Sequence, residues 1–230
     1  MLQPSDIKET PLFSDTVRSM QTFEERKNKI VFSSLHEYYE PVSAGGFSIK
    51  YVVDGTEIYT LNNEQHIVTA NSYLLCNSAQ TGHVEIESRN NVKGICISIA
   101  PEIITEAAAS YLEPDSLKCD EALGAFFLSP DFPEDHYAAA DTATGKVLQQ
   151  LAANAASKKI SREELQPELF YTISEFLIKD QIPVFRQLQS IPSVKASTKK
   201  LLYKNIRRSK EFMDAYFTQN IDVAAIAREV

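Results

Sequence analysis

The chain has 230 residues, of which 43% are hydrophobic and 23% are charged, and its formal net charge is −8 at pH 7. This composition is that of an ordinary globular protein with enough length to bury a core, which excludes disordered and fibrous classes. No run of residues approaches the ~18 apolar residues of a membrane span, and the polar N-terminus does not resemble a signal peptide, so we expect a cytoplasmic protein with no membrane partner.

The first 29 residues contain two prolines, mixed charge and little periodicity, and they predict a loose N-terminal arm with a short helix near Asp15 to Lys27. The character changes at residue 30. From there to residue 100, β-branched and aromatic residues come in short runs separated by turn residues, which is typical of strands. Residues 47–53 alternate between apolar and mostly polar side chains before Asp54-Gly55, which predicts a half-buried strand that ends in a turn.

Two asparagine pairs predict tight hairpins, because asparagine tolerates a left-handed backbone. Asn62-Asn63 separates residues 57–61 from 65–69, and Asn90-Asn91 separates residues 83–88 from 92–99. A further short apolar strand is expected at residues 72–77. Six or so short strands joined in this way imply a small antiparallel barrel or sandwich over residues 30–100.

Helical periodicity follows from residue 101 to residue 190. We expect helices over residues 102–112, 120–128, 141–157 and 161–180, the last with Ser161 as N-cap and Glu164 at the capping-box position. Pro183 is expected to kink or end that helix. The predicted fold class is therefore α+β, with an antiparallel β-barrel followed by a helical hairpin.

The end of the chain differs from the body in charge. Ile191-Pro192-Ser193 breaks the chain, and residues 195–210 then hold seven basic side chains and no acidic one. Residues 1–194 have a net charge of −12, with 15 basic and 27 acidic side chains, whereas residues 195–230 have a net charge of +4. An acidic body with a basic tail suggests a binding domain joined to a nucleic-acid module, although a solvated basic helix face is the plainer interpretation.

The tail reads as an amphipathic helix over residues 198–217, a break at Asn220 with Asp222 as N-cap, and a short helix from Val223 to Val230. It resembles the start of the DNA-binding domain of AraC-type transcription regulators. Those proteins show a helix of the "LxxIAxxV" kind, which is matched here by Val223, Ile226, Ala227 and Val230. The stretch YVVDGTEIYTLNNEQHIVTANSYLLCNSAQTGH resembles the cupin-like sensor domain that precedes that module.

The resemblance implies a ligand-sensing, dimerising N-terminal domain that controls two helix-turn-helix units. The expected segments are an arm (1–29), a cupin-like sensor (30–100), a helical dimerisation and linker region (101–190) and an incomplete helix-turn-helix domain (191–230). The sequence stops before the recognition helix, which suggests a truncated regulator that does not itself bind DNA specifically. DNA is then a partner of the longer parent protein. A homodimer is expected, with residues 161–180 as its face by analogy, and a small-molecule effector is a possible ligand.

Candidate ligand-binding residues lie on the predicted strands. Tyr51 and Tyr59 offer an aromatic face and a hydroxyl to a small molecule, and Glu57 and His83 lie at positions that the resemblance assigns to the barrel mouth. The alternative is that each aromatic residue simply fills the core and that the histidine is structural.

We expect no metal and no cofactor. In the cupin pattern, Glu57-Ile58-Tyr59 replaces the HxH pair, Glu64 takes the glutamate position, and His83 lies near the final histidine, so that two imidazoles are lost. The three cysteines, Cys76, Cys96 and Cys119, are widely spaced without a CxxC pair and predict free thiols.

In the basic segment, Lys204, Arg207 and Arg208 are candidates for accessory contacts to the DNA backbone, since phosphate contacts position such proteins without reading the sequence. Two other functions stay open. One is a cupin-type metal enzyme, an isomerase or dioxygenase, which the missing HxH pair disfavours. The other is a protein-interaction module with a collapsed, ligand-free barrel. We expect a protein that is not an enzyme.

Overall fold

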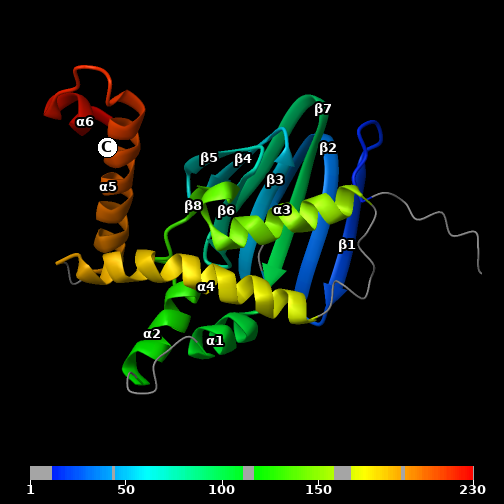
Figure 1. Ribbon diagram of the computed structural model, residues 1–230, viewed down its shortest axis with the longest axis horizontal. Helices are drawn as coiled ribbons and strands as arrows, with labels where there is room; N and C mark the ends of the chain where they lie inside the picture. The colour runs from blue at the N-terminus through cyan, green and yellow to red at the C-terminus, as the bar shows by residue number, and fades with distance from the viewer. Residues whose placement is uncertain (1–11, 43–44, 111–116, 158–166, 193–194, 230) are drawn as a thin grey trace, which may run out of the picture.

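The computed structural model describes residues 12–42, 45–110, 117–157, 167–192 and 195–229 (Figure 1). Its eight strands are β1 (Ser19–Glu25), β2 (Asn28–Val42), β3 (Phe47–Asp54), β4 (Thr56–Leu61), β5 (Glu64–Thr69), β6 (Ser72–Asn77), β7 (Gly82–Ile99) and β8 (Asp135–Ala138). The α-helices are α1 (Pro101–Ser110), α2 (Leu117–Leu128), α3 (Ala143–Ala156), α4 (Pro167–Ser190), α5 (Ala196–Tyr216) and α6 (Val223–Glu229), and a 3₁₀ turn, η1, spans Ala139–Asp141. The α+β class is confirmed.

All the strand pairs are antiparallel, and the sheet order is β1-β2-β7-β3-β6-β8, while β4 pairs with both β5 and β7. The hairpin at Asn62-Asn63 is confirmed, because both residues adopt the left-handed conformation with φ of 49° and 67°. Asn71, between β5 and β6, has a φ of 60° for the same reason.

The predicted hairpin at Asn90-Asn91 is wrong, because these residues lie within the continuous strand β7. The 15-residue β2 is long enough to pair with both halves of β7, from Lys29 opposite Ser98 to Val42 opposite Gly82, with one irregularity near Leu35. The amide of Asn91 donates hydrogen bonds to the carbonyls of Ser14 and Val17 at 3.0 and 3.1 Å. Asn91 therefore anchors the N-terminal segment instead of turning the chain.

The helix predicted near residues 15–27 is also wrong, since β1 occupies Ser19–Glu25. This strand pairs residue for residue with β2, and its Phe23 ring meets that of Phe32 at 5.9 Å between centroids in an edge-on arrangement. Pairing with an exposed sheet edge therefore outweighs a weak local preference.

Alternation along the central strands divides the core into two clusters. On β3, Phe47, Ile49 and Tyr51 belong to the larger cluster, which also contains side chains of α1, α3 and α4. The intervening Val52 belongs to a smaller cluster inside the curled sheet, together with residues of β4 to β7 such as Tyr59 and Leu74. In Figure 1, α3 and α4 cross one side of the sheet, which leaves the other side to enclose an interior of its own.

Helix α4 continues through Pro183, so the prediction that this proline ends the helix is wrong. The ring is exposed, whereas Val184, Phe185 and Leu188 beyond it are buried, and this burial holds the last turns in place. The predicted apolar stripe at Phe170 and its successors is buried as expected. Ser161 and Glu164 lie outside the described residues.

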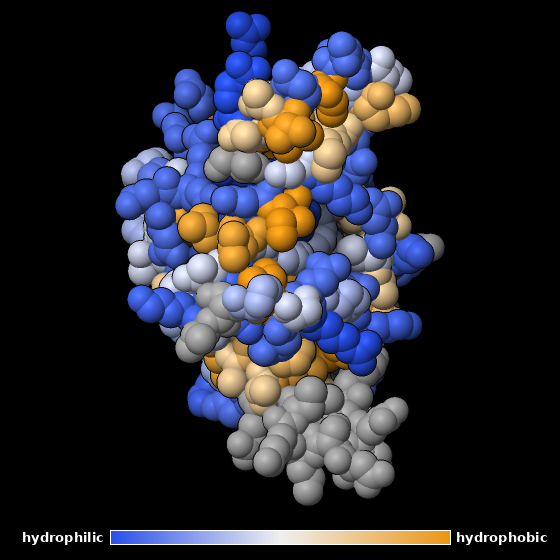
Figure 2. All heavy atoms as spheres, turned by 90° about the vertical axis from the view of Figure 1, so that its left-hand side faces the viewer, coloured by the Kyte–Doolittle hydropathy of each residue, from blue (hydrophilic) through white to orange (hydrophobic). Residues whose placement is uncertain are grey.

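The last two helices form an arm beside the sheet, on the side away from β1 (Figure 1). The predicted N-cap of the last helix is confirmed, because the Ala225 N–H donates to Asp222 Oδ1 at 2.7 Å. Tyr203 is the buried residue of α5. Apolar side chains on the rest of this arm, among them Ile206, Phe217 and Val223, are exposed, and Figure 2 shows apolar groups in orange on this side.

Candidate ligand cavity and barrel–helix contact

The interior of the curled sheet contains a cavity of about 210 Å³. Strands β2, β3, β4 and β7 contribute to its wall, and its apolar part includes Leu35, Val42, Val84 and Ile86. Three polar side chains of interest, Lys50, Glu57 and Tyr59, also line it. A largely apolar pocket with a few converging polar groups is the usual form of a small-molecule site.

Lys50 lies on β3 between Ile49 and Tyr51, and strand alternation turns it away from the helix layer toward the cavity. Only 7% of the residue is exposed, and its Nζ lies 2.9 Å from Cys96 Sγ on β7. Burial disfavours the charged form, but Cys96, Cys76 and Glu57 favour it, and the balance raises the pKa of Lys50 above its usual value. Lys50 therefore brings a positive charge into the cavity at neutral pH.

Glu57 and Tyr59 are two residues apart on β4, so their side chains lie on the same face of the strand. Tyr59 Oη donates a hydrogen bond to Glu57 Oε2 at 2.5 Å, and both residues are 5% exposed. Burial raises the pKa of Glu57, while Tyr59 and Lys50 oppose that change. Burial also raises the pKa of Tyr59 well above its usual value, so the phenol stays a proton donor.

The absence of a side chain at Gly94 makes room for Glu57. A Cβ atom on Gly94 would lie 2.5 Å from Glu57 Oε1 and 3.0 Å from Ser33 Oγ. Any larger residue on this part of β7 would therefore displace the carboxylate from its position in the cavity wall.

The two other predicted ligand residues lie elsewhere. Tyr51 belongs to the helix-side core, and its hydroxyl donates to Asn71 Oδ1 at 3.2 Å. His83, near the start of β7, packs against Tyr39 with ring centroids 4.7 Å apart, and it does not line the cavity. Among the described residues, no group of three or more histidine, cysteine, aspartate or glutamate side chains is placed to hold a metal ion.

The sequence analysis missed Lys50 and Cys96. The signal for Lys50 was present, because a lysine at an inward position of an otherwise apolar strand requires a partner inside the protein. Cys96 carried no such signal, since its position depends on the register that places it opposite Lys50.

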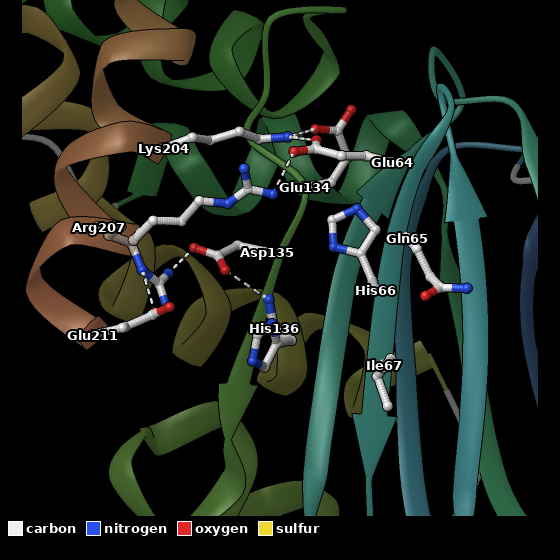
Figure 3. A pocket seen from close by; sticks show the side chains of 11 residues that line it. Glu64, Gln65, His66, Ile67, Glu134, Asp135, His136, Lys204, Arg207 and Glu211 are labelled. Atoms are coloured by element: carbon white, nitrogen blue, oxygen red, sulfur yellow. Dashed lines mark hydrogen bonds and ion pairs between the residues drawn. The ribbon is translucent and has the colours of Figure 1, made fainter. Parts of the chain in front are cut away.

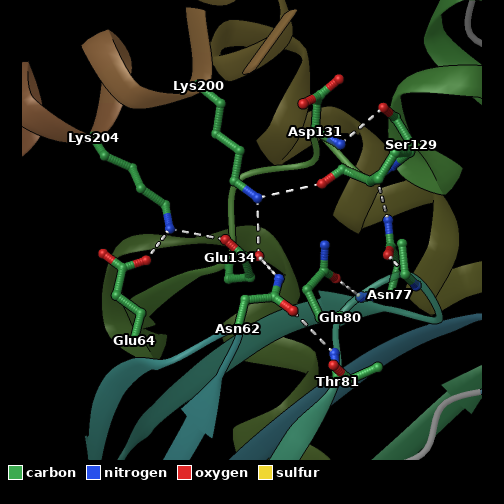
Figure 4. A network of polar contacts seen from close by, with 12 residues as sticks. Asn62, Glu64, Asn77, Gln80, Thr81, Ser129, Asp131, Glu134, Lys200 and Lys204 are labelled. Carbon is green, nitrogen blue, oxygen red and sulfur yellow. Dashed lines mark hydrogen bonds and ion pairs between the residues drawn. The ribbon is translucent and has the colours of Figure 1, made fainter. Parts of the chain in front are cut away.

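A second polar site joins the sheet to α5, and Glu134 lies at its centre (Figure 4). This glutamate is 4% exposed, and its carboxylate accepts hydrogen bonds from Lys200 Nζ at 2.9 Å, Lys204 Nζ at 2.8 Å and Asn62 Nδ2 at 3.0 Å. Burial alone would raise the pKa of Glu134, but the hydrogen bonds from Lys204 and Lys200 outweigh it and lower the pKa below its usual value. Glu134 is therefore ionised at neutral pH.

Each of the three predicted DNA-backbone residues has an acidic partner here (Figure 3). Lys204 contacts Glu64 as well as Glu134, and Arg208 Nη2 lies 3.2 Å from Glu64 Oε1. Arg207 contacts Asp135 and Glu211, and its guanidinium lies 5.3 Å from the centroid of the Tyr137 ring. These residues border a cleft of about 390 Å³ between the sheet and α5.

Comparison with known proteins identifies the domain. The family model described as "AraC-like ligand binding domain" matches residues 34–173. No curated protein sequence matches the chain. No helix in the described part of the chain is long and apolar enough to cross a membrane.

Three solved structures are similar in fold. A cupin superfamily protein from Desulfitobacterium hafniense has 9% identity and a TM-score of 0.33, covering 38% of this chain and 81% of its own. A cupin protein from Bacteroides fragilis has 13% identity and a TM-score of 0.31, covering 34% and 74%. The AraC-like transcriptional activator CuxR has 9% identity and a TM-score of 0.47, covering 91% and 68%. Since the family model matches more than half of its residues, the chain belongs to the family of AraC-like ligand binding domains.

Proposed function

We propose that this protein is the ligand-sensing and dimerising part of a cytoplasmic, DNA-binding transcription regulator. The observation that carries the proposal is the cavity inside the family-matched domain, where Lys50, Glu57 and Tyr59 meet an apolar wall. Buried polar groups cost free energy unless they have partners, so a cavity with such groups favours an occupant. Binding rather than catalysis follows from the family, which is a ligand-binding one. In this proposal residues 30–100 sense the ligand, and residues 101–190 dimerise and link.

The basic side chains of α5 connect the sensor to DNA in this proposal. Helices α5 and α6, in residues 191–230, begin a helix-turn-helix module, and Lys204, Arg207 and Arg208 contact phosphates in the longer protein. The same side chains are paired with sheet-side carboxylates such as Glu64 and Glu134. Phosphates and these carboxylates therefore compete for the same cations. Residues 1–230 alone are not expected to bind DNA with sequence specificity.

Dimerisation is assigned to the outer surface of α3 and α4. A groove of about 430 Å³ lies between these helices, and half-buried Val147, Leu169 and Phe176 line it. A second copy that covers these side chains would remove apolar area from water. Phe176→Glu should convert the dimer to a monomer in analytical ultracentrifugation with an unchanged circular dichroism spectrum, whereas a wild-type monomer would contradict the assignment.

Thermal unfolding of the purified chain with a library of water-soluble metabolites tests the sensing function. At least one compound should raise the melting temperature, and Glu57→Gln should abolish that increase without loss of fold. Hydrogen exchange of the α5 amides should change when that compound binds, because the sensor must alter the helix to act on DNA. A folded chain that responds to no compound would favour the protein-interaction module.

A further inference from the structure

The cavity holds two buried, opposite charges that are not paired with each other. Lys50 is 7% exposed and Glu57 is 5% exposed, and both line the same 210 Å³ space. Both residues lie in the described part of the chain, where Lys50 and Glu57 form no ion pair with each other or with any other described residue. A buried charge without a counter-charge is costly, so the site is electrostatically incomplete when empty.

Each charge keeps unused hydrogen-bonding capacity. The Lys50 ammonium has three N–H donors, and its partner among the described side chains is the Cys96 sulfur, a weak acceptor. Tyr59 occupies one carboxylate oxygen of Glu57, while Oε1 has no hydrogen-bond partner in the described part of the chain. The cavity therefore offers donors to an anion from one side and an acceptor to a cation from the other.

The remaining surface and the size of the cavity limit the rest of the ligand. Leu35, Val42, Val84 and Ile86 form an apolar wall, which favours a hydrocarbon body over a sugar. At ~30 Å³ per water molecule, the space corresponds to about seven water molecules, which suits a molecule of about ten non-hydrogen atoms or fewer. A polymer or a nucleotide does not fit such a space.

We propose that the cavity binds a small zwitterion, an aliphatic amino acid with one carboxylate and one ammonium group. Its carboxylate accepts hydrogen bonds from Lys50, its ammonium donates to Glu57 Oε1, and its side chain contacts the apolar wall. This inference rests on the proposed sensing function and names its ligand class. A simple carboxylate would leave Glu57 without a counter-charge, and a simple amine would leave Lys50 without one.

Isothermal titration of the 230-residue chain tests the inference. The probes are L-alanine, L-valine and L-leucine, compared with isopentylamine and 4-methylpentanoate, which are leucine without its carboxylate and without its ammonium group. At least one of the amino acids should bind at least tenfold more tightly than either single-charge analogue, because each analogue loses one charge-assisted interaction.

Two variants assign the charges. Lys50→Met should lower amino-acid affinity at least tenfold and remove the preference over the amine, whereas Glu57→Gln should remove the preference over the carboxylate. Lys179→Met, which changes an exposed lysine on α4, is the matched control and should leave every affinity unchanged. Circular dichroism establishes that each variant is folded, and Glu57→Gln keeps the test decisive if Lys50→Met does not fold.

The outcomes separate this inference from the function on which it rests. Equal binding of an amino acid and a single-charge analogue, or no binding of any of the three amino acids, overturns the zwitterion. If the metabolite library still yields a compound whose effect Glu57→Gln abolishes, the sensing function stands and only the ligand class fails. If no compound stabilises the chain, both fail.

Discussion

Removal of the charge of Glu134 should loosen α5 from the sheet and destabilise the protein. In Glu134→Gln, Lys200 and Lys204 lose the carboxylate that they share, although their side chains are 16% and 17% exposed and can turn partly toward water. Breaking a fully buried ion pair costs about 3–5 kcal/mol, and hydrogen bonds to charged groups contribute about 1.5–3 kcal/mol. With this partial exposure and the retained amide oxygen, we expect a loss of about 2 kcal/mol.

Urea denaturation followed by circular dichroism at pH 7 measures this loss. With an m-value of ~2 kcal/mol per molar urea, the midpoint should fall by about 1 M. Glu85→Gln is the matched control, because Glu85 is exposed on β7 and has no ion-pair partner among the described residues, and its effect should stay within about 0.5 kcal/mol. Adding Lys204→Met to Glu134→Gln should recover part of the loss, since it removes one of the unpaired charges.

The pH dependence gives an independent test. The pKa of Glu134 is lower in the folded protein than its usual value, so its contribution is fully present above pH ~4.5, near the unfolded pKa. The difference in unfolding free energy between wild type and Glu134→Gln should therefore be constant from pH 7 to about pH 5. It should shrink as the pH falls further through the folded pKa. A Glu134→Gln variant no less stable than Glu85→Gln, or a difference that grows on acidification, would refute the reasoning.

Three further substitutions test the packing around the sheet. Asn77→Ala should cost about 2–3 kcal/mol in urea denaturation, because the 1% exposed amide donates to the carbonyls of Phe127 and Ser129 at 2.9 and 2.8 Å. Asp180→Asn should cost about 1 kcal/mol in the same assay, since this carboxylate of α4 accepts the first N–H groups of α3 at 3.1 and 2.7 Å. Gly145→Ala should lower the melting temperature, as its methyl group would overlap neighbouring backbone, whereas Gly45→Ala meets no atom within 4 Å and should have little effect.

Local patterns were sufficient where one residue type dictates the backbone. Asn62-Asn63 turned the chain and Asp222 capped a helix because each needs only its immediate neighbours. Asn90-Asn91 misled because the same residue type is tolerated in an exposed strand when a long partner strand is present. The four-residue β8 was not predicted at all, since it is a strand only through its pairing with β6.

The candidate site was predictable only in part, for a similar reason. Glu57 and Tyr59 could be assigned to one face of one strand from their spacing. The placement of Tyr51 on the helix side depended on which face of β3 the helices cover, and no local pattern in β3 specifies that. The pairing of Lys204, Arg207 and Arg208 with acidic residues was equally hidden, because Glu64 and Glu134 are distant in sequence and come together only in the fold.

The alternation of side chains on β3 has a consequence for how specificity can change. Lys50 in the cavity wall and Ile49 and Tyr51 in the helix-side core are consecutive residues, so the two environments are separated by the thickness of a single backbone. A methyl group added or removed beneath α3 or α4 shifts that backbone and alters the dimensions of the space on its other side. Selection for a new effector can therefore act on side chains that never touch it.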